Sequence, residues 1–189
     1  MSHAVVVQQV ARLPFPAEGG GSSPTPRLQF ERVAVAETAP LLSTHHYLGP
    51  VNGGRFAFAG WVDDVMVACQ VYRHPTARML AQDGSWLELS RWCLTSGAGK
   101  NAGSRMMRWV AGQLRRNAPE VRMLVSYSDP IHGHTGSLYR ASGWVASPTH
   151  HTDRFHANGV GYPSGHGSWD GETRQSPKER WTFQLKENP

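Results

Sequence analysis

The run from Val121 to Trp144 constrains the fold most, because it joins an apolar strand to a short helix through a polar turn. Val121–Val125 is mostly apolar and reads as a buried strand. The sequence SDPIHGHTG follows, and the residues after it predict a helix over 134–142. Asp129 therefore lies at the carboxyl end of a strand and Tyr139 lies on the helix. This arrangement is a common way to build a small active site.

The rest of the sequence supplies the other elements of an α/β domain. At 189 residues the chain is long enough for one domain with a real core. Residues 14–26 are rich in Pro, Gly and Ser, so we expect an N-terminal arm and flexible linker over 1–26 and one folded domain over 27–189. Apolar and alternating stretches predict strands at 28–35, 56–61, 65–72, 86–94, 121–128, 144–146 and 181–185, and helices at 36–47, 103–116 and 134–142. This order predicts a mixed sheet with helices on both faces.

Residues 129–144 also carry a distinctive pattern, D-P-x-x-G-H-T-G-x-x-Y-x-A-x-x-W. The pattern resembles the Mom-like DNA-modification proteins of bacteriophages, which are variants of the GNAT acetyltransferase fold. The resemblance implies a GNAT-like α/β domain with a mixed, mostly antiparallel central sheet and helices on both faces. It also implies transfer of a carbamoylmethyl group to the N6 amine of adenine in double-stranded DNA, which would protect phage DNA from host restriction.

Asp129 and Tyr139 are the first catalytic candidates in this pattern. Adenine N6 is a poor nucleophile because its lone pair is delocalised into the ring. The Asp129 carboxylate and the Ser128 carbonyl would accept its protons and permit attack; alternatively, Asp129 caps the turn as an Asx motif. The Tyr139 phenol would donate a proton to a leaving group or stack on an extruded base, unless it is a half-buried core tyrosine. The resemblance adds Tyr47, whose H-Y-L element would face the same site; core packing is the alternative.

Arg91 is the next candidate, in the predicted strand WLELSRWCL. Strict alternation puts Arg91 on an otherwise apolar face, together with Leu87, Leu89 and Cys93. A cation there needs a carboxylate or phosphate partner. The resemblance implies functional roles for Arg91 and for Ser104 on the next helix. The alternatives are a buried ion pair for Arg91 and a helix N-cap for Ser104.

The loop from Ser96 to Arg105 lies where a GNAT protein binds pyrophosphate. Backbone N–H groups at the start of a helix form an anion-binding site. The acetyl-CoA pattern of the fold, [QR]-x-x-G-x-[GA], aligns with Ala98–Gly103 and keeps only the final small residue. The resemblance therefore implies a CoA-derived donor, or another small acyl or alkyl donor, held by Gly99, Lys100, Asn101, Gly103 and Ser104.

Positive charge is concentrated near this loop. The chain has a net charge of +5, and the window 91–122 contains seven Lys or Arg residues against one acid. On a helical wheel, one side carries Met107, Val110, Ala111 and Leu114, and the opposite side carries Arg105, Arg108, Arg115 and Arg116. Such a stripe is either a solvated face or a grip on a duplex backbone. We expect DNA contacts from Lys100, Arg105, Arg108, Arg115 and, at the turn, His134.

Other residues bear on metal binding, redox state and location. A metal ion stays open, because oxygen and nitrogen ligand types gather at His150, His151, Asp153 and His156. Cys69 and Cys93 lie in predicted strands and are expected to be buried thiols in a reducing cytoplasm. No apolar stretch reaches the ~18 residues of a membrane span, so we expect a cytoplasmic protein without membrane contact. The donor, the DNA sequence context and the oligomeric state, a homodimer included, stay open.

Three other functions compete with adenine carbamoylmethylation. A conventional CoA-dependent N-acetyltransferase keeps the fold and Tyr139 but needs the pyrophosphate loop that is eroded here. An adenine methyltransferase using S-adenosylmethionine would explain S-D-P-I, but the chain lacks the Gly-rich nucleotide motif and the length of that fold. A non-catalytic DNA-binding protein would explain the arginine stripe but not the pattern over 129–144.

Overall fold

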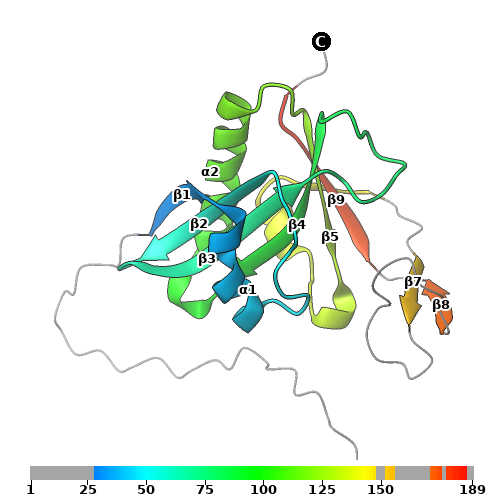
Figure 1. The fold of residues 1–189 in the computed structure, drawn as a ribbon, viewed down its shortest axis with the longest axis horizontal. Helices are drawn as coiled ribbons and strands as arrows, with labels where there is room; N and C mark the ends of the chain where they lie inside the picture. The colour runs from blue at the N-terminus through cyan, green and yellow to red at the C-terminus, as the bar shows by residue number, and fades with distance from the viewer. Residues whose placement is uncertain (1–27, 148–151, 156–170, 176–177, 187–189) are drawn as a thin grey trace, which may run out of the picture.

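The computed structural model describes residues 28–147, 152–155, 171–175 and 178–186. A seven-stranded sheet has the order β1-β2-β3-β4-β5-β9-β6, and β7 pairs with β8 separately (Figure 1). The strands are β1 (Gln29–Val33), β2 (Phe56–Val62), β3 (Val65–Arg73), β4 (Trp86–Leu94), β5 (Met123–Ser128), β6 (Val145–Ser147), β7 (Thr152–Phe155), β8 (Glu172–Gln175) and β9 (Glu179–Gln184). The helices are α1 (Ala39–His45), α2 (Ala102–Asn117) and α3 (Ser137–Ala141), with 3-10 turns η1 (Val35–Thr38), η2 (Ser96–Ala98) and η3 (Pro130–His132).

Helices cover both faces of the large sheet. Its neighbouring strands are antiparallel except β4 and β5, which run parallel. On one face, Leu42 of α1 packs with Ala57, Cys69, Val71 and Cys93. On the other face, α2 and α3 pack on the main hydrophobic core, and Figure 1 shows α1 and α2 on opposite sides of the sheet. The expected mixed, mostly antiparallel sheet with helices on both faces is confirmed.

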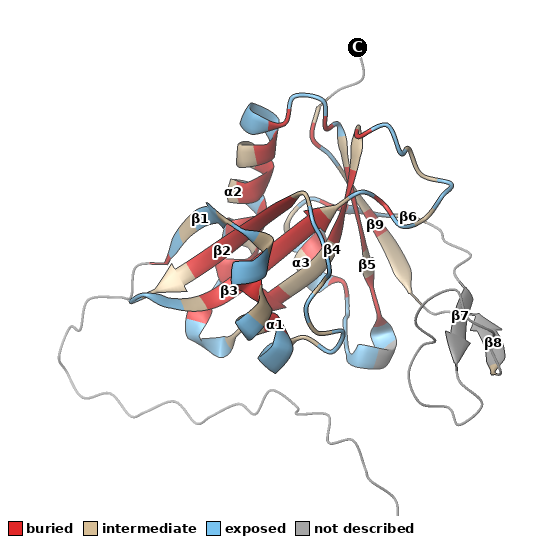
Figure 2. Ribbon diagram, viewed as in Figure 1, coloured by how far each residue is buried: buried red, intermediate tan, exposed pale blue. Residues whose placement is uncertain are grey.

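Helix α2 has the amphipathic pattern that the wheel predicts. Its buried residues are Ala102, Gly103, Met106, Met107, Val110, Ala111 and Leu114, and its arginines are exposed (Figure 2). Burial of this apolar side fixes α2 on the sheet, since each fully buried aliphatic side chain contributes ~1.5–3 kcal/mol. Arg115 also makes intramolecular contacts: its Nε donates to the Leu185 carbonyl at 2.8 Å, and its guanidinium lies 5.7 Å from the Phe183 ring centroid.

The β2–β3 hairpin turns between the two strands that the sequence predicts over 56–61 and 65–72. Asp63 and Asp64 both have positive φ, 47° and 62°. Two consecutive left-handed residues match the twist of an antiparallel pair, and Asp tolerates that conformation.

Two predicted helices are shorter in the structure, each for a local reason. The helix expected over 36–47 is a 3-10 turn followed by α1, which places Pro40 in the first turn of α1, where its missing N–H is not needed. The helix expected over 134–142 begins only at Ser137. Gly136, with φ of 69°, lies in the left-handed region that an α-helix cannot include.

The face assigned to Arg91 is wrong. Between β3 and β4 the register shifts by one residue, so that Val71 pairs with Arg91 but Tyr72 pairs with Leu89. This β-bulge at Ser90 interrupts the alternation. Leu89 and Leu87 therefore face α2, whereas Arg91 and Cys93 face α1.

The β7–β8 pair, which joins Thr152–Phe155 to Glu172–Gln175, has no counterpart among the predicted strands. Asp153 lies in β7, and the other metal candidates, His150, His151 and His156, lie outside the described residues. Within the described ranges, no group of three or more His, Cys, Asp or Glu side chains could hold a metal ion. No helix in the same ranges is long and apolar enough to cross a membrane.

Candidate active site

A cavity of about 270 Å³ lies where β4 and β5 separate. The two strands pair only from Trp86↔Met123 to Glu88↔Val125, and Figure 1 shows them diverging beyond this point. A parallel pair that separates in the middle of a sheet leaves a gap that other side chains must line. The lining residues come from the segment after α1, from both strands, and from the turn and helix that follow β5: His46, Tyr47, Leu48, Leu89, Ser90, Trp92, Ser126, Tyr127, Gly133, His134, Thr135, Gly136, Ser137, Leu138 and Tyr139.

Tyr139 is the best-positioned polar group of this cavity. Its ring is nearly buried, stacked on Trp181 at 5.4 Å between centroids and edge-on to Trp144 at 5.4 Å. Its hydroxyl lies 2.8 Å from Ser126 Oγ. Burial raises the pKa of Tyr139, and the Ser126 hydrogen bond opposes that shift only in part. Tyr139 is therefore a protonated phenol held in one orientation, as a general acid must be.

Tyr47 belongs to an aromatic cluster at the same cavity. Its ring stacks on His132 at 3.9 Å and on His46 at 5.0 Å, and His134 meets it edge-on at 5.6 Å. Tyr47 is 44% exposed. An exposed aromatic ring beside a cavity can stack on a flat ligand such as a base.

His46 and His134 present neutral rings to the cavity. Burial, with smaller contributions from Arg91, His134 and His132, lowers the pKa of His46 to about 4. Burial also lowers the pKa of His134, with a contribution from His132. Each Nδ1 accepts a backbone N–H, from Leu48 at 3.2 Å and from Asp129 at 3.4 Å respectively. The ring proton of each neutral histidine therefore lies on Nε2, which is a hydrogen-bond donor.

Asp129 organises the turn but does not line the cavity. It is 1% exposed, and its carboxylate forms an ion pair with Lys178 at 3.8 Å. Its carbonyl accepts the N–H groups of His132 and His134 at 3.0 and 3.2 Å. These contacts hold the turn together, and the predicted contact of Asp129 with adenine N6 stays a prediction.

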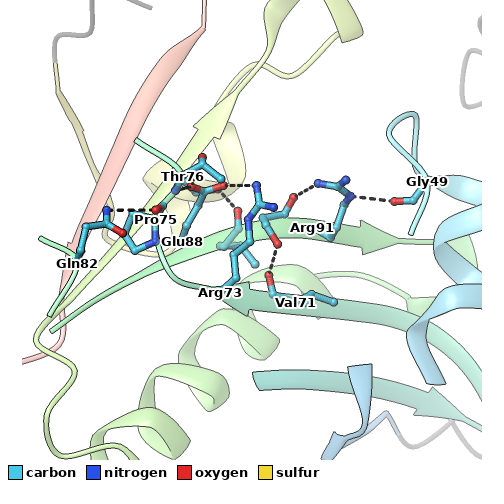
Figure 3. A network of polar contacts seen from close by, with 11 residues as sticks. Gly49, Val71, Arg73, Pro75, Thr76, Gln82, Glu88 and Arg91 are labelled. Carbon is cyan, nitrogen blue, oxygen red and sulfur yellow. Dashed lines mark hydrogen bonds and ion pairs between the residues drawn. The ribbon is translucent and has the colours of Figure 1, made fainter. Parts of the chain in front are cut away.

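Arg91 bonds to backbone carbonyls, in contrast to the carboxylate or phosphate expected for it. Its Nε donates to Gly49 O and its Nη1 to Ser90 O, both at 2.8 Å (Figure 3). The nearby carboxylate of Glu88 is engaged elsewhere, by Arg73 Nη2 at 3.1 Å and by the backbone and hydroxyl of Thr76 at 2.8 Å. Arg91 therefore ties the segment that carries Tyr47 to the bulge of β4, and does not line the cavity itself.

The loop before α2 has a partly preserved anion cradle. Asn101, with φ of 60°, is the N-cap without a side-chain hydrogen bond. Ser104 is the third helical residue and donates to the Asn101 carbonyl at 3.2 Å, so it is not the N-cap. The first amides of any α-helix lack intrahelical partners, which leaves those of Gly103 and Ser104 for an anion. Lys100 is exposed beside them.

Gly103 has a packing role in addition to its place in the cradle. A Cβ at Gly103 would lie 2.8 Å from Leu138 Cδ1. The glycine thus allows α2 to approach α3, which carries Tyr139. Gly99, with φ of 77°, supplies the left-handed residue at the end of η2. None of the predicted donor-binding residues, Gly99, Lys100, Asn101, Gly103 and Ser104, lines the cavity beside Tyr139.

The structure brings together three of the predicted site residues: Tyr47, Tyr139 and His134 line one cavity. Lys100, Arg105 and Arg108 are exposed on and before α2, as DNA contacts require. Ser126 and Trp181, which hold Tyr139, are not among the predicted site residues. Their only local signal is a polar or aromatic side chain in a predicted strand, and that signal is too common to identify a site.

Several solved structures of acetyltransferases are similar to this one. The IAA acetyltransferase from Bacillus cereus is 10% identical, with a TM-score of 0.55 over 84% of this chain and 99% of that chain. A GNAT acetyltransferase from Elizabethkingia anophelis with acetyl-CoA bound is 11% identical, with a TM-score of 0.54 over 83% of this chain and 97% of that chain. An N-acetyltransferase from Staphylococcus aureus is 12% identical, with a TM-score of 0.52 over 84% and 98%. These likenesses show the GNAT fold.

The sequence comparisons identify the family. No curated protein matches the chain at a significant level. Residues 27–182, which include every described element except the last residues of β9, match the Mom protein family. The protein therefore belongs to the Mom protein family and has the GNAT fold.

Proposed function

We propose that this protein transfers a carbamoylmethyl group to the N6 amine of adenine in double-stranded DNA and so protects phage DNA from host restriction. The observation that carries the proposal is the family match over residues 27–182, together with a cavity that places Tyr139, Tyr47 and His134 around one point. A cavity of about 270 Å³ is small for a ligand site, near the lower end of the usual ~300–1,000 Å³. It suits a single flat group such as a base extruded from the duplex.

The reaction would use Tyr139 as a proton donor. The N6 lone pair attacks the methylene carbon of the donor, a C–N bond forms, and the bond from that carbon to the leaving group breaks. The leaving group takes the bonding electrons and a proton from Tyr139, and N6 loses one proton, which restores the phenol through solvent. The Tyr47 ring would contact the base, and the Nε2–H groups of His46 and His134 would bond to its ring nitrogens.

Asp129 retains a place in this proposal with one condition. Its carboxylate forms an ion pair with Lys178 in the structure, so an N6 proton must replace that contact. Lys178 would move to a DNA phosphate as the base enters, because phosphate oxygens are strong partners for lysine. Asp129→Asn, which keeps one acceptor but loses the charge, is expected to abolish modification.

DNA binding would use the exposed cations on and just before α2. Lys100, Arg105 and Arg108 lie outside the hydrophobic core and can reach a phosphate backbone. Arg115 is a weaker candidate because its guanidinium is held by Leu185 and Phe183. The amides of Gly103 and Ser104 fit an anionic part of the donor, which supplies the alkyl group; the donor itself stays open.

A CoA-dependent N-acetyltransferase is the second candidate. The GNAT fold and the phenol of Tyr139 favour it. The pyrophosphate loop argues against it, since Ala98 and Asn101 stand where the acetyl-CoA pattern has a polar residue and a glycine. Calorimetric titration with acetyl-CoA separates the candidates: tight binding favours acetylation of an amine, and no binding favours another donor.

Mass spectrometry of nucleosides from plasmid DNA tests the proposal. Bacteria that express the protein should contain a deoxyadenosine heavier by one carbamoylmethyl group less one hydrogen, and their plasmid should resist restriction enzymes that need unmodified adenine. Tyr139→Phe should abolish the product. Tyr72→Phe is a matched control, because it removes a buried hydroxyl that donates to Gln70 and does not line the cavity. Unmodified DNA in cells with folded wild-type protein would refute the proposal.

A further inference from the structure

Ser126 lies in the cavity wall and connects two oxygen atoms. It is 2% exposed on β5. Its Oγ lies 3.0 Å from the Leu89 carbonyl oxygen and 2.8 Å from the Tyr139 hydroxyl. A serine hydroxyl has one proton, and a carbonyl only accepts. The three oxygens therefore share the protons of two hydroxyl groups, which allows two arrangements.

The two arrangements direct the phenolic proton differently. In the first, Ser126 donates to Leu89 O and Tyr139 donates to Ser126, so the phenolic proton stays inside the wall. In the second, Ser126 donates to Tyr139 and the phenolic proton is free to point into the cavity. Rotation about two C–O bonds interconverts them without moving a charge.

We propose that Ser126 is a positioning residue that directs the proton of Tyr139 into the cavity and stabilises the phenolate that proton transfer leaves. The inference rests on the proposed function, in which Tyr139 protonates the leaving group. As the O–H bond of Tyr139 breaks, the proton goes to the leaving group and the phenolate oxygen accepts the hydrogen bond of Ser126. The proton released by N6 then returns to the phenol, so the protons balance.

The surroundings of Tyr139 make such a donor necessary. Its ring stacks on Trp181 and meets Trp144 edge-on. A buried anion without a hydrogen bond is costly. Two other titratable or charged groups lie near Tyr139. Tyr72 of β3 is close enough that Tyr139 affects the pKa of Tyr72, and the Arg140 guanidinium lies 5.4 Å from the centroid of the Trp181 ring. Neither donates to the Tyr139 hydroxyl in the structure, whereas Ser126 lies within hydrogen-bond distance of it.

Ser128 provides a matched control on the same strand face. Residues two apart in a strand point to the same side, and Ser128 Oγ accepts the indole N–H of Trp181 at 2.9 Å. Ser126 and Ser128 thus hold the two partners of one aromatic stack, Tyr139 by its hydroxyl and Trp181 by its nitrogen. Ser128→Ala loosens the stack but leaves the hydroxyl pair intact, so it separates packing from proton positioning.

The first test measures DNA modification by the full chain against pH. Ser126→Ala should slow modification by roughly 10- to 100-fold, less than Tyr139→Phe, because a general acid contributes ~10²–10⁴. Loss of the hydrogen bond should also move the alkaline limb of the pH–rate profile to higher pH. Ser126→Thr keeps the hydroxyl, and its added methyl can point into the cavity. This variant should keep both the wild-type rate and the wild-type alkaline limb. Ser128→Ala should keep the wild-type limb; an equal shift in both alanine variants, or none in Ser126→Ala, would overturn the inference.

The second test does not depend on DNA modification. In protein labelled with ¹³C at tyrosine Cζ, Tyr139→Phe identifies the Tyr139 resonance, whose pH titration gives its pKa. Ser126→Ala should raise that pKa, and Ser126→Cys, a weak donor of similar size, should give an intermediate value if the alanine variant fails to fold. A titration of Tyr139 that is the same with and without the serine hydroxyl would refute the inference. Absence of modification by the wild-type protein would instead refute the proposed function while this test still stands.

Discussion

Gly136 offers the sharpest test of how the site is built. It lies between β5 and α3 with φ of 69°, and a Cβ there would lie 2.2 Å from Trp181 Cζ2 and 3.0 Å from Cε2 and Cη2. Trp181 cannot swing aside freely, because it is 1% exposed, bonded through Nε1 to Ser128 and stacked on Tyr139. Gly136→Ala should therefore push the indole that orients the proposed acid.

The expected magnitude follows from two separate effects. An alanine in the left-handed region costs ~1–2 kcal/mol. Forcing a methyl group into a packed core costs a further ~1–3 kcal/mol, which gives ~2–5 kcal/mol for Gly136→Ala. Gly133 in the same turn has φ of 76° but nothing within 4 Å of its Cβ position. Gly133→Ala should thus cost only the backbone part, ~1–2 kcal/mol.

Urea unfolding followed by tryptophan fluorescence would measure both variants, with near-UV circular dichroism to report the Trp181 environment. The difference between the two losses in the free energy of unfolding reports the contact with the indole and should be ~1–3 kcal/mol. Each kcal/mol corresponds to ~2–4 °C in Tm for a chain of this size. Equal losses in Gly136→Ala and Gly133→Ala would show that backbone strain alone matters and that Trp181 is not held as described.

Three further predictions concern the effect of pH, the hydrogen bonds of Arg91 to Gly49 and Ser90, and DNA binding. The pKa of His46 is about 4 in the native protein and ~6.5 in the unfolded chain. The contribution of neutral His46 to stability is therefore complete above pH ~6.5 and is lost as the pH falls towards 4. Urea midpoints should decline less between these two pH values in His46→Gln than in the wild type. Arg91→Lys keeps the charge but not both hydrogen bonds to backbone carbonyls, and should lower the free energy of unfolding by ~1–3 kcal/mol. Unchanged stability in urea would show that these two hydrogen bonds do not stabilise the fold. Replacing Arg105 and Arg108 with Ala should reduce the salt slope of DNA affinity by roughly 2 units with less than ~0.5 kcal/mol loss of stability, whereas Arg78→Ala, in the β3–β4 loop, should keep the slope.

Much of the fold could be predicted because its signals are local. Residues 86–94 form the strand that alternation predicts, and the Asp63-Asp64 turn follows from the tolerance of Asp for positive φ. The bulge at Ser90 could not be predicted, because register depends on the partner strand and not on the strand's own residues. One shifted residue moved Arg91 to the other face of the sheet and changed its partners from an expected acid to two carbonyls.

The family resemblance indicated some of the residues that line the cavity, but not the contacts of each one. Tyr139, His134 and Tyr47 line one cavity, whereas Asp129, the first residue of the pattern over 129–144, does not line it and pairs with Lys178. An isolated acid in a turn reads equally well as a ligand contact and as a structural partner, since both satisfy a buried carboxylate. The lysine that pairs with Asp129 lies 49 positions away along the chain, and no local pattern indicates it.

The spacing of Ser126 and Ser128 shows what a local pattern can and cannot supply. Two hydroxyls on one buried strand face must each find a partner, because buried polar groups are almost always hydrogen-bonded. The two serines of the strand MLVSYS show this requirement in the sequence. Their partners lie on α3 and β9, whose positions beside β5 depend on the complete sheet. This pair of serines holds both members of an aromatic stack beside a cavity, so the same two hydrogen bonds satisfy buried groups and orient the proposed acid, Tyr139. A substitution at either serine should therefore reveal which of the two roles dominates, through stability at Ser128 and through the titration of Tyr139 at Ser126.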